Sequence, residues 1–119
     1  MYSLIINKTG VANWYKKEWY KNNLCHRSND LPAIEYTNNY KRKEFYKNGL
    51  QYYFVQQDNG TKEYYDFCGR PHNVDGPAIS YSNGDYEYWI HGERHRKDGP
   101  AVVIGDQQYW FKFGSFINV

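Results

Sequence analysis

The chain has 119 residues, which is enough for one domain with a modest core. Its 15 lysine and arginine residues nearly balance 13 aspartate and glutamate residues, so the net charge of +2 neither requires nor excludes a nucleic-acid partner. No apolar run approaches the roughly 20 residues of a membrane-spanning helix, so we expect no membrane partner.

The chain is rich in aromatic residues, which we expect to lie in β-strands. Aromatic side chains make up 20% of the chain, and 14 of them are tyrosines, which favour β-strands. The two cysteines, Cys25 and Cys68, are too few for a disulfide framework. The N-terminal residues show no basic segment or cleavage signal. We therefore expect a soluble protein of a reducing compartment, without a cofactor.

Turn signals divide the chain at nearly regular intervals. The turns fall at Asn23, Gly49, Gly69, Gly92 and Gly114, which are separated by 26, 20, 23 and 22 residues. A period of about 23 residues with a shared local pattern indicates a repeat architecture. In chain order the expected elements are an N-terminal cap (1–17), four hairpin repeats (18–43, 44–62, 63–86 and 87–108) and a C-terminal cap (109–119). The pattern predicts a single all-β domain, an antiparallel meander of stacked hairpins.

Each repeat is expected to contain an aromatic strand, a turn, a second strand and another turn. A phrase that begins with histidine precedes the second strand in three repeats: HRSNDLPA (26–33), HNVDGPA (72–78) and HRKDGPA (95–101). The proline before the last residue of each phrase lies where the next strand begins, a position at which the missing amide costs little. The repeat at 44–62 lacks the phrase but still alternates and contains Asn-Gly turns, so we interpret it as a degenerate hairpin.

The histidines and aspartates of the phrases are predicted to be structural turn residues. Because they recur at equivalent places, we expect each imidazole to hydrogen-bond the Asp-containing turn of its own phrase. These residues are His26, Asp30, His72, Asp75, His95 and Asp98. The four-residue spacing from Cys68 to His72 and from His91 to His95 crosses a hairpin turn, so no metal site is predicted. No nucleophile next to a base breaks the repeat, and we expect no catalytic residues.

The aromatic residues before each turn form two columns that point to opposite faces. The first column, which we expect in the core, contains Trp19, Phe45, Tyr65, Tyr88 and Trp110. The second column includes Asp66, which suggests contact with solvent and an exposed aromatic stripe. The stripe consists of Tyr20, Tyr46, Trp89 and Phe111. Two alternatives to an exposed stripe remain. In the first, the sheet curls enough to cover both of its faces. In the second, the extra residue in the third repeat shifts Asp66 off the column, so Asp66 says nothing about its exposure.

The phrases HRKDGPA and HNVDGPA, together with EYWIHG, YKNG and SNGD, resemble a known repeat type. They are similar to the HRxDGPA-type repeats of giant-virus and bacteriophage proteins, which resemble the MORN class of stacked β-hairpins. The resemblance covers residues 18–114, although Leu31 departs from the pattern and the second repeat lacks it. It implies a viral scaffold that binds a partner in the host cytoplasm and is seldom an enzyme.

Two functions follow from these observations. The first is a protein-binding module that inhibits a host factor, such as a CRISPR or other immune effector, through the stripe and the charges of Arg27, Arg94 and Arg96. The alternative is single-stranded nucleic-acid or glycan binding by aromatic stacking. Acidic residues interleave with the basic ones along the sequence, which favours a host protein as partner. An unpaired edge strand at either end could also pair with a second copy.

Overall fold

The computed structural model describes residues 1–8, 15–37 and 42–117, and all of its regular structure is β. Every strand pairing is antiparallel, so the predicted all-β antiparallel fold is confirmed. The sequence led us to expect one domain. By backbone contacts the chain divides into two compact units, Met1–Tyr52 and Tyr53–Val119. The boundary lies within the hairpin that lacks the histidine phrase.

The first unit is a row of antiparallel strands in the order β1-β2-β4-β5-β6, with β3 paired to β2. Its strands are β1 (Tyr2–Lys8), β2 (Tyr15–Lys21), β3 (Leu24–Cys25), β4 (Ile34–Tyr36), β5 (Lys43–Lys47) and the first residues of β6 (Leu50–Gln56). Successive strands are neighbours in the sheet, as in a meander.

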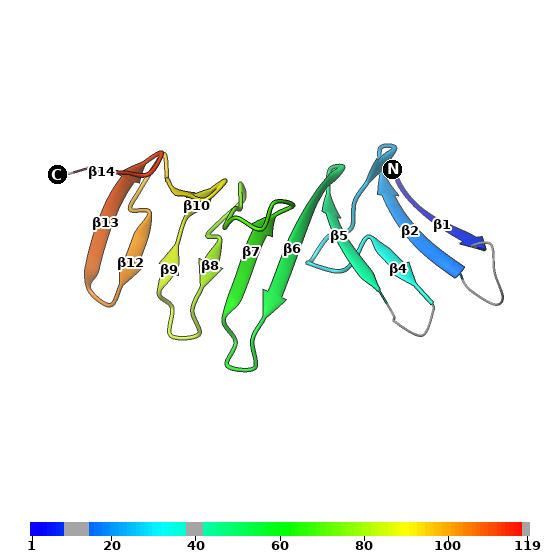
Figure 1. Cartoon of the computed structure of the whole chain (residues 1–119), viewed down its shortest axis with the longest axis horizontal. Helices are drawn as coiled ribbons and strands as arrows, with labels where there is room; N and C mark the ends of the chain where they lie inside the picture. Colours follow the sequence, from blue (N-terminus) through cyan, green and yellow to red (C-terminus); the bar gives the residue numbers. More distant parts are fainter. Residues whose placement is uncertain (9–14, 38–41, 118–119) are drawn as a thin grey trace. The chain divides into compact units, whose positions relative to one another are not determined.

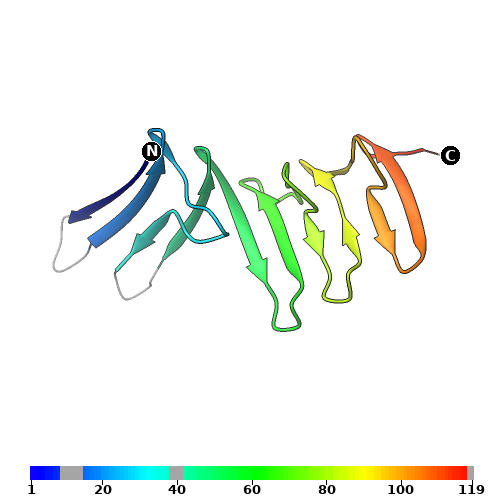
Figure 2. The same ribbon diagram turned by 180° about the vertical axis from the view of Figure 1, so that it is seen from behind.

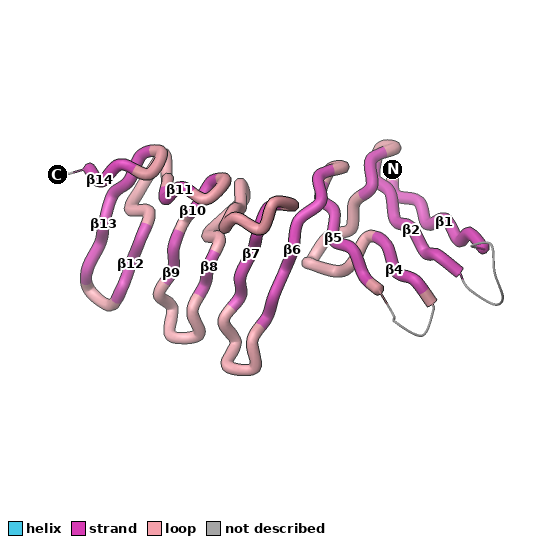
Figure 3. Tube along the Cα trace, in the orientation of Figure 1, coloured by secondary structure: helices cyan, strands magenta, loops and turns pink. Residues whose placement is uncertain are grey.

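The second unit continues the same pattern in the order β7-β8-β9-β12-β13-β14, and β10 and β11 form a separate small hairpin. Its strands are β7 (Lys62–Asp66), β8 (Ile79–Ser80), β9 (Tyr86–Glu87), β10 (Trp89–Ile90), β11 (Glu93–Arg94), β12 (Val102–Ile104), β13 (Gln107–Lys112) and β14 (Ser115–Ile117). The loops between these strands are drawn in pink in Figure 3.

The strands of each unit lie side by side in a single layer (Figure 1), and the view from behind shows no second layer among the described residues (Figure 2). Buried side chains are consequently few and small. The apolar ones are Ala33, Ile34, Ala78, Ala101 and Val102, and no large described side chain is fully buried. A single-layer sheet leaves both of its faces partly open to solvent.

The hairpin turns have the backbone geometry of type I′ turns. In the turns Asn48-Gly49 and His91-Gly92 both residues have positive φ angles, of 50° and 82° and of 44° and 82°. This conformation favours asparagine and glycine and matches the twist of the flanking strands. A Cβ atom on Gly92 would also lie 3.3 Å from the Arg70 side chain of the preceding hairpin. Glycine at position 92 therefore allows both the positive φ angle of the turn and the close approach of the Arg70 side chain.

The histidine of each phrase connects its own hairpin to the turn of the next one. Its Nδ1 atom accepts a hydrogen bond from the backbone amide of the residue before the turn glycine. These bonds join His26 to the Asn48 amide (2.9 Å), His72 to the His91 amide (2.9 Å) and His95 to the Phe113 amide (3.1 Å). The sequence placed the histidine bond within the Asp turn of the same phrase, whereas the Nδ1 partner lies about 20 residues further along the chain. His26 also makes a contact of the predicted kind, because its Nε2 atom lies 3.3 Å from the Ser28 hydroxyl of its own phrase.

The aspartates of the phrases have less uniform surroundings. Asp30 accepts a hydrogen bond from the Tyr52 hydroxyl (3.1 Å), so it contacts the hairpin that lacks a phrase. The Asp75 amide donates to the Asn73 side chain (3.1 Å). This bond closes an Asx turn, as predicted, but the accepting side chain belongs to Asn73 and not to Asp75. Asp98 is exposed in the corresponding loop.

The alanine that ends each phrase is fully buried between two strands. The Ala33 amide donates to the Glu44 carbonyl, and its carbonyl accepts from the Trp19 amide. Ala78 makes the equivalent pair with Glu87 and Tyr64. A larger side chain has no space here, since the exposed fraction of each alanine is 0%. Ala101 makes the same kind of pair with Tyr109 and Tyr88, so the alanines of the three phrases are equivalent.

Candidate binding surface

One face of each unit carries glutamates that hydrogen-bond an aromatic residue two positions later. Alternate residues of a strand share a face, so each pair lies side by side. The bonds run from Tyr20 to Glu18 (3.3 Å), Tyr46 to Glu44 (3.1 Å), Tyr65 to Glu63 (2.7 Å) and the Trp89 indole to Glu87 (3.2 Å). We call this the glutamate face of each unit.

The glutamates of this face are buried or half-buried, and their neighbours set their charge. Burial opposes ionisation of Glu18, but hydrogen bonds from Lys16 and Asn7 outweigh it and lower the pKa of its carboxyl group. Burial and the bond to Glu44 raise the pKa of Tyr46 to about 12. The Glu18 carboxylate is therefore ionised and the Tyr46 phenol protonated at neutral pH. A hydrogen bond to an ionised carboxylate is charge-assisted.

In the second unit the glutamate face presents an arginine between aromatic rings. The guanidinium carbon of Arg94 lies 5.0 Å from the ring centre of Trp89 and 5.4 Å from that of Phe111. Its side chain is 43% exposed, and its contact with Glu87 is long, at 3.7 Å. Phe116, which is 57% exposed, packs edge-on against Phe111 at 5.5 Å. We call Trp89, Arg94, Phe111 and Phe116 the aromatic platform.

Within each unit the predicted partner-binding residues lie on both faces of the sheet, and not on one. Tyr20 and Tyr46 belong to the first unit, whereas Trp89, Phe111 and Arg94 belong to the second. Arg27 and Arg96 lie on the opposite faces, where their guanidinium groups stack on Trp19 (3.8 Å) and Tyr88 (4.1 Å). Each also donates to the carbonyl of the proline in its own phrase. These two arginines hold the phrase loops against the sheet.

The predicted contrast between a buried and an exposed aromatic column was wrong. Both columns are half-buried, because the described strands of each unit form a single layer that leaves both faces partly open. The extra residue in the third repeat also shifts the alignment. The Tyr64 amide donates to the Ala78 carbonyl, as the Trp19 amide does to Ala33, so Tyr64 takes the place predicted for Tyr65. Tyr65 in turn takes the place predicted for Asp66.

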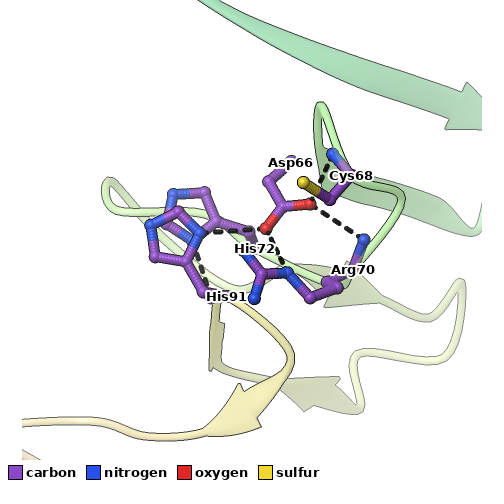
Figure 4. Close-up of polar contacts among 5 residues, drawn as sticks. All are labelled: Asp66, Cys68, Arg70, His72 and His91. Atoms are coloured by element: carbon purple, nitrogen blue, oxygen red, sulfur yellow. Dashed lines mark hydrogen bonds and ion pairs between the residues drawn. The ribbon is translucent and has the colours of Figure 1, made fainter.

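Asp66 is buried rather than in contact with solvent, with an exposed fraction of 3%. Figure 4 shows the polar contacts of its carboxylate. Its Oδ1 atom accepts from the amides of Cys68 (3.0 Å) and Arg70 (2.9 Å). Its Oδ2 atom lies 2.9 Å from both the Arg70 Nε and the His91 Nδ1. Burial opposes ionisation, but the bonds from His91 and Arg70 prevail and lower the pKa of Asp66 to about 2. The Asp66 carboxylate therefore links the turn that follows β7 to the turn His91-Gly92.

The geometry of this cluster disfavours a metal ion. The rings of His72 and His91 are stacked, with centres 3.9 Å apart and planes 16° from parallel. Nitrogen lone pairs in nearly parallel stacked planes do not converge on one ion, as tetrahedral ligands must. Both Nδ1 atoms are already hydrogen-bonded. Over residues 1–8, 15–37 and 42–117 no group of three metal-binding side chains occurs.

Sequence reasoning missed the glutamates and Phe116. The sequence favours pairing of Glu18, Glu44 and Glu87 with nearby lysine and arginine, and each does lie beside a basic side chain, that of Lys16, Arg42 or Arg94. The aromatic partners on the same strand were not predicted. The spacing Glu-x-Tyr or Glu-x-Trp is the signal that could have found them, because it repeats four times. Cys25 and Cys68 are free thiols in the structure.

Comparison of the chain with known protein families, curated proteins and solved structures gives no significant match. Within the described residues there is no helix of the length and hydropathy that a membrane span requires.

Proposed function

We propose that this chain is a MORN-like hairpin-repeat protein that acts as a binding module without catalysis, and that its partner is a host protein. The aromatic platform of the second unit supports this proposal. Arginine and tryptophan are the residues most enriched in the energetic centres of protein interfaces. Here an exposed guanidinium lies within 5.4 Å of two aromatic rings.

The arrangement of the platform suits a protein partner that presents a carboxylate or a carbonyl beside an apolar side chain. Arg94 can donate several hydrogen bonds in a fixed plane, and Trp89 and Phe116 offer apolar surface on either side. The rings also limit the freedom of the guanidinium, so less entropy is lost on binding.

Base stacking on the same platform is less favourable. Glu87 lies beside Trp89 on this face, and the indole donates to its carboxylate. A nucleic-acid phosphate would be repelled by this charge, whereas a protein surface can complement it.

The resemblance to viral hairpin repeats supports a more specific proposal. The equivalent hydrogen bonds of the three phrases are consistent with repeats of one type. We propose an accessory protein of the host cytoplasm that blocks a host factor, such as a CRISPR or other immune effector.

Affinity capture from host lysate, with and without nuclease, tests the protein-binding proposal. We expect a stoichiometric host protein that survives nuclease and is lost with Arg94→Glu, which reverses the charge of the platform. Lys112→Glu is the matched control, because Lys112 is exposed on the opposite side of β13 from Phe111. Equal capture by both variants, or complete loss with nuclease, would contradict the proposal.

A further inference from the structure

Strand alternation separates the charges of the first unit onto opposite faces. The segments KEWYK (17–21) and KEFYK (43–47) occupy β2 and β5. In each segment the glutamate lies on one face, and the two lysines lie on the other face with an aromatic residue between them. We call this second surface the lysine face of the first unit; it consists of Lys17, Trp19, Lys21, Lys43, Phe45 and Lys47. Acidic and basic residues that interleave in the sequence are therefore apart in space.

Glu35 is the one carboxylate that the described strands of this unit place on the lysine face. It lies between Lys17 of β2 and Lys43 of β5 in the strand register. Its carboxylate is already 3.4 Å from the Arg27 guanidinium. Among the residues whose positions are known, no carboxylate lies within ion-pair distance of Lys17 or Lys43. Asp30 adds a second carboxylate beside this face, because it accepts a hydrogen bond from Tyr52, which lies opposite Phe45 in the strand register. Four lysines and Arg27 still outnumber Glu35 and Asp30, so the face keeps an excess of positive charge.

The basic residues on the opposite face are neutralised. Lys16 lies 3.0 Å from the Glu18 carboxylate, and Arg42 lies 3.6 Å from that of Glu44. Each is the sequence neighbour of a lysine on the lysine face. In each neighbouring pair of cations, one member is next to a glutamate on the glutamate face and the other lies on the lysine face.

The spacing on the lysine face suits a flexible chain of phosphates. Alternate residues of one strand are about 7 Å apart, and β2 and β5, with β4 between them, are separated by about 10 Å. Two lysine–aromatic–lysine columns therefore run across the face. Proteins that bind single strands combine such cations with aromatic rings on which bases stack. Arg27, stacked on Trp19, adds a planar cation that can itself stack on a base.

We infer that the lysine face of the first unit binds single-stranded nucleic acid, with its lysines on phosphates and Phe45 and the Arg27–Trp19 pair against bases. A duplex is a poorer ligand because its bases are already stacked and because a sheet face offers no element that enters a groove. This surface is distinct from the aromatic platform, so it does not depend on the protein-binding proposal.

Fluorescence anisotropy with the full chain and a labelled oligothymidylate of about 20 nucleotides tests the inference, since such modules cover roughly 4–16 nucleotides. Binding should weaken as salt rises from about 50 to about 200 mM. The double variant Lys17→Gln, Lys43→Gln should bind about tenfold more weakly and lower the slope of log K against log salt by about 1.4. Lys17→Arg, Lys43→Arg should restore both values.

The matched control is Lys16→Gln, Arg42→Gln, which changes the net charge equally at neighbouring positions on the glutamate face. It should change affinity less than about twofold, because its cations already pair with glutamates. Thermal melting of both variants checks that each is folded. Equal weakening by the two double variants, or no binding at low salt, overturns the inference. Competition by polyglutamate or by anionic phospholipid vesicles as strong as that by unlabelled oligothymidylate also overturns it, because the face would then recognise negative charge alone.

Discussion

The hairpins that carry the histidine phrase differ from the hairpin at 44–62, which lacks it. Where the phrase is present, the second strand is only two or three residues long, as in β4 and β8. A loop held by the histidine and the buried alanine completes the contact with the next hairpin. Where the phrase is absent, β6 runs without interruption for 7 residues. The boundary between the two compact units falls within this strand.

The phrase therefore replaces strand pairing with a few specific side-chain contacts. A continuous strand tolerates many side chains, because its hydrogen bonds come from the backbone. A phrase loop depends on one acceptor nitrogen and one small residue. We therefore expect mutations in the phrases to cost more stability than mutations in β6.

The largest effect is expected at the buried alanines. Ala78→Leu adds three carbon atoms where the exposed fraction is 0%, and it should lower the free energy of unfolding by about 3 kcal/mol. Val55→Leu in β6, where the side chain is 45% exposed, should change it by less than about 0.5 kcal/mol. Urea unfolding of both variants measures the difference, and similar losses would contradict the comparison.

The next effect concerns the histidine acceptor. His26→Phe keeps a ring but leaves the Asn48 amide without its acceptor, which should cost about 2 kcal/mol of unfolding free energy. Gln57→Ala removes an exposed hydrogen bond to Glu63 and should cost less than about 0.5 kcal/mol. Chemical denaturation distinguishes them. If His26→Phe is as stable as the unmodified chain, the ring alone holds the turn.

The smallest effect is a two-stage dependence of stability on pH. Burial lowers the pKa of His26 and His72, so the folded chain favours their neutral, hydrogen-bond-accepting form. Their contribution is complete above the unfolded value of 6.5 and is lost as pH falls below it. The contribution of Asp66 is complete above 3.8 and is lost as pH falls toward about 2.

Melting temperature measured against pH should therefore fall in two steps, one as pH falls below 6.5 and one as pH falls from 3.8 toward about 2. The variant His26→Phe, His72→Phe should lack the first step and keep the second. Asp66→Asn should lack the second step only. One step that persists in all variants would show that other groups control the acid response.

The sequence predicted the fold class but only part of the site. Alternation and Asn-Gly turns are local signals, so the antiparallel hairpins and the turn at Gly49 followed from them. The bond from His26 to Asn48 joins residues 22 apart, and no local spacing reveals it. Whether the residues of the aromatic stripe are exposed depends on what covers each face of the sheet. A single sequence does not state this.

The sorting of charges was present in the sequence but was not recognised. Glu18 and Lys17 are neighbours, and a strand places neighbours on opposite faces. Acidic residues that interleave with basic ones in a sequence do not exclude a basic surface, because a strand places neighbouring residues on opposite faces. Asp66 shows the opposite case. One extra residue moved it off the aromatic column to the end of β7, where the backbone amides of the following turn and the side chain of His91 surround it.

The single layer of the sheet has a thermodynamic consequence. Unfolding usually raises the heat capacity by about 12–15 cal/mol/K per residue, mainly because buried apolar surface meets water. In the described part of this chain no large side chain is fully buried, so the increase per residue should be smaller. A small heat-capacity change flattens the curve of stability against temperature. The protein should then keep nearly the same modest stability over a wide range of temperature.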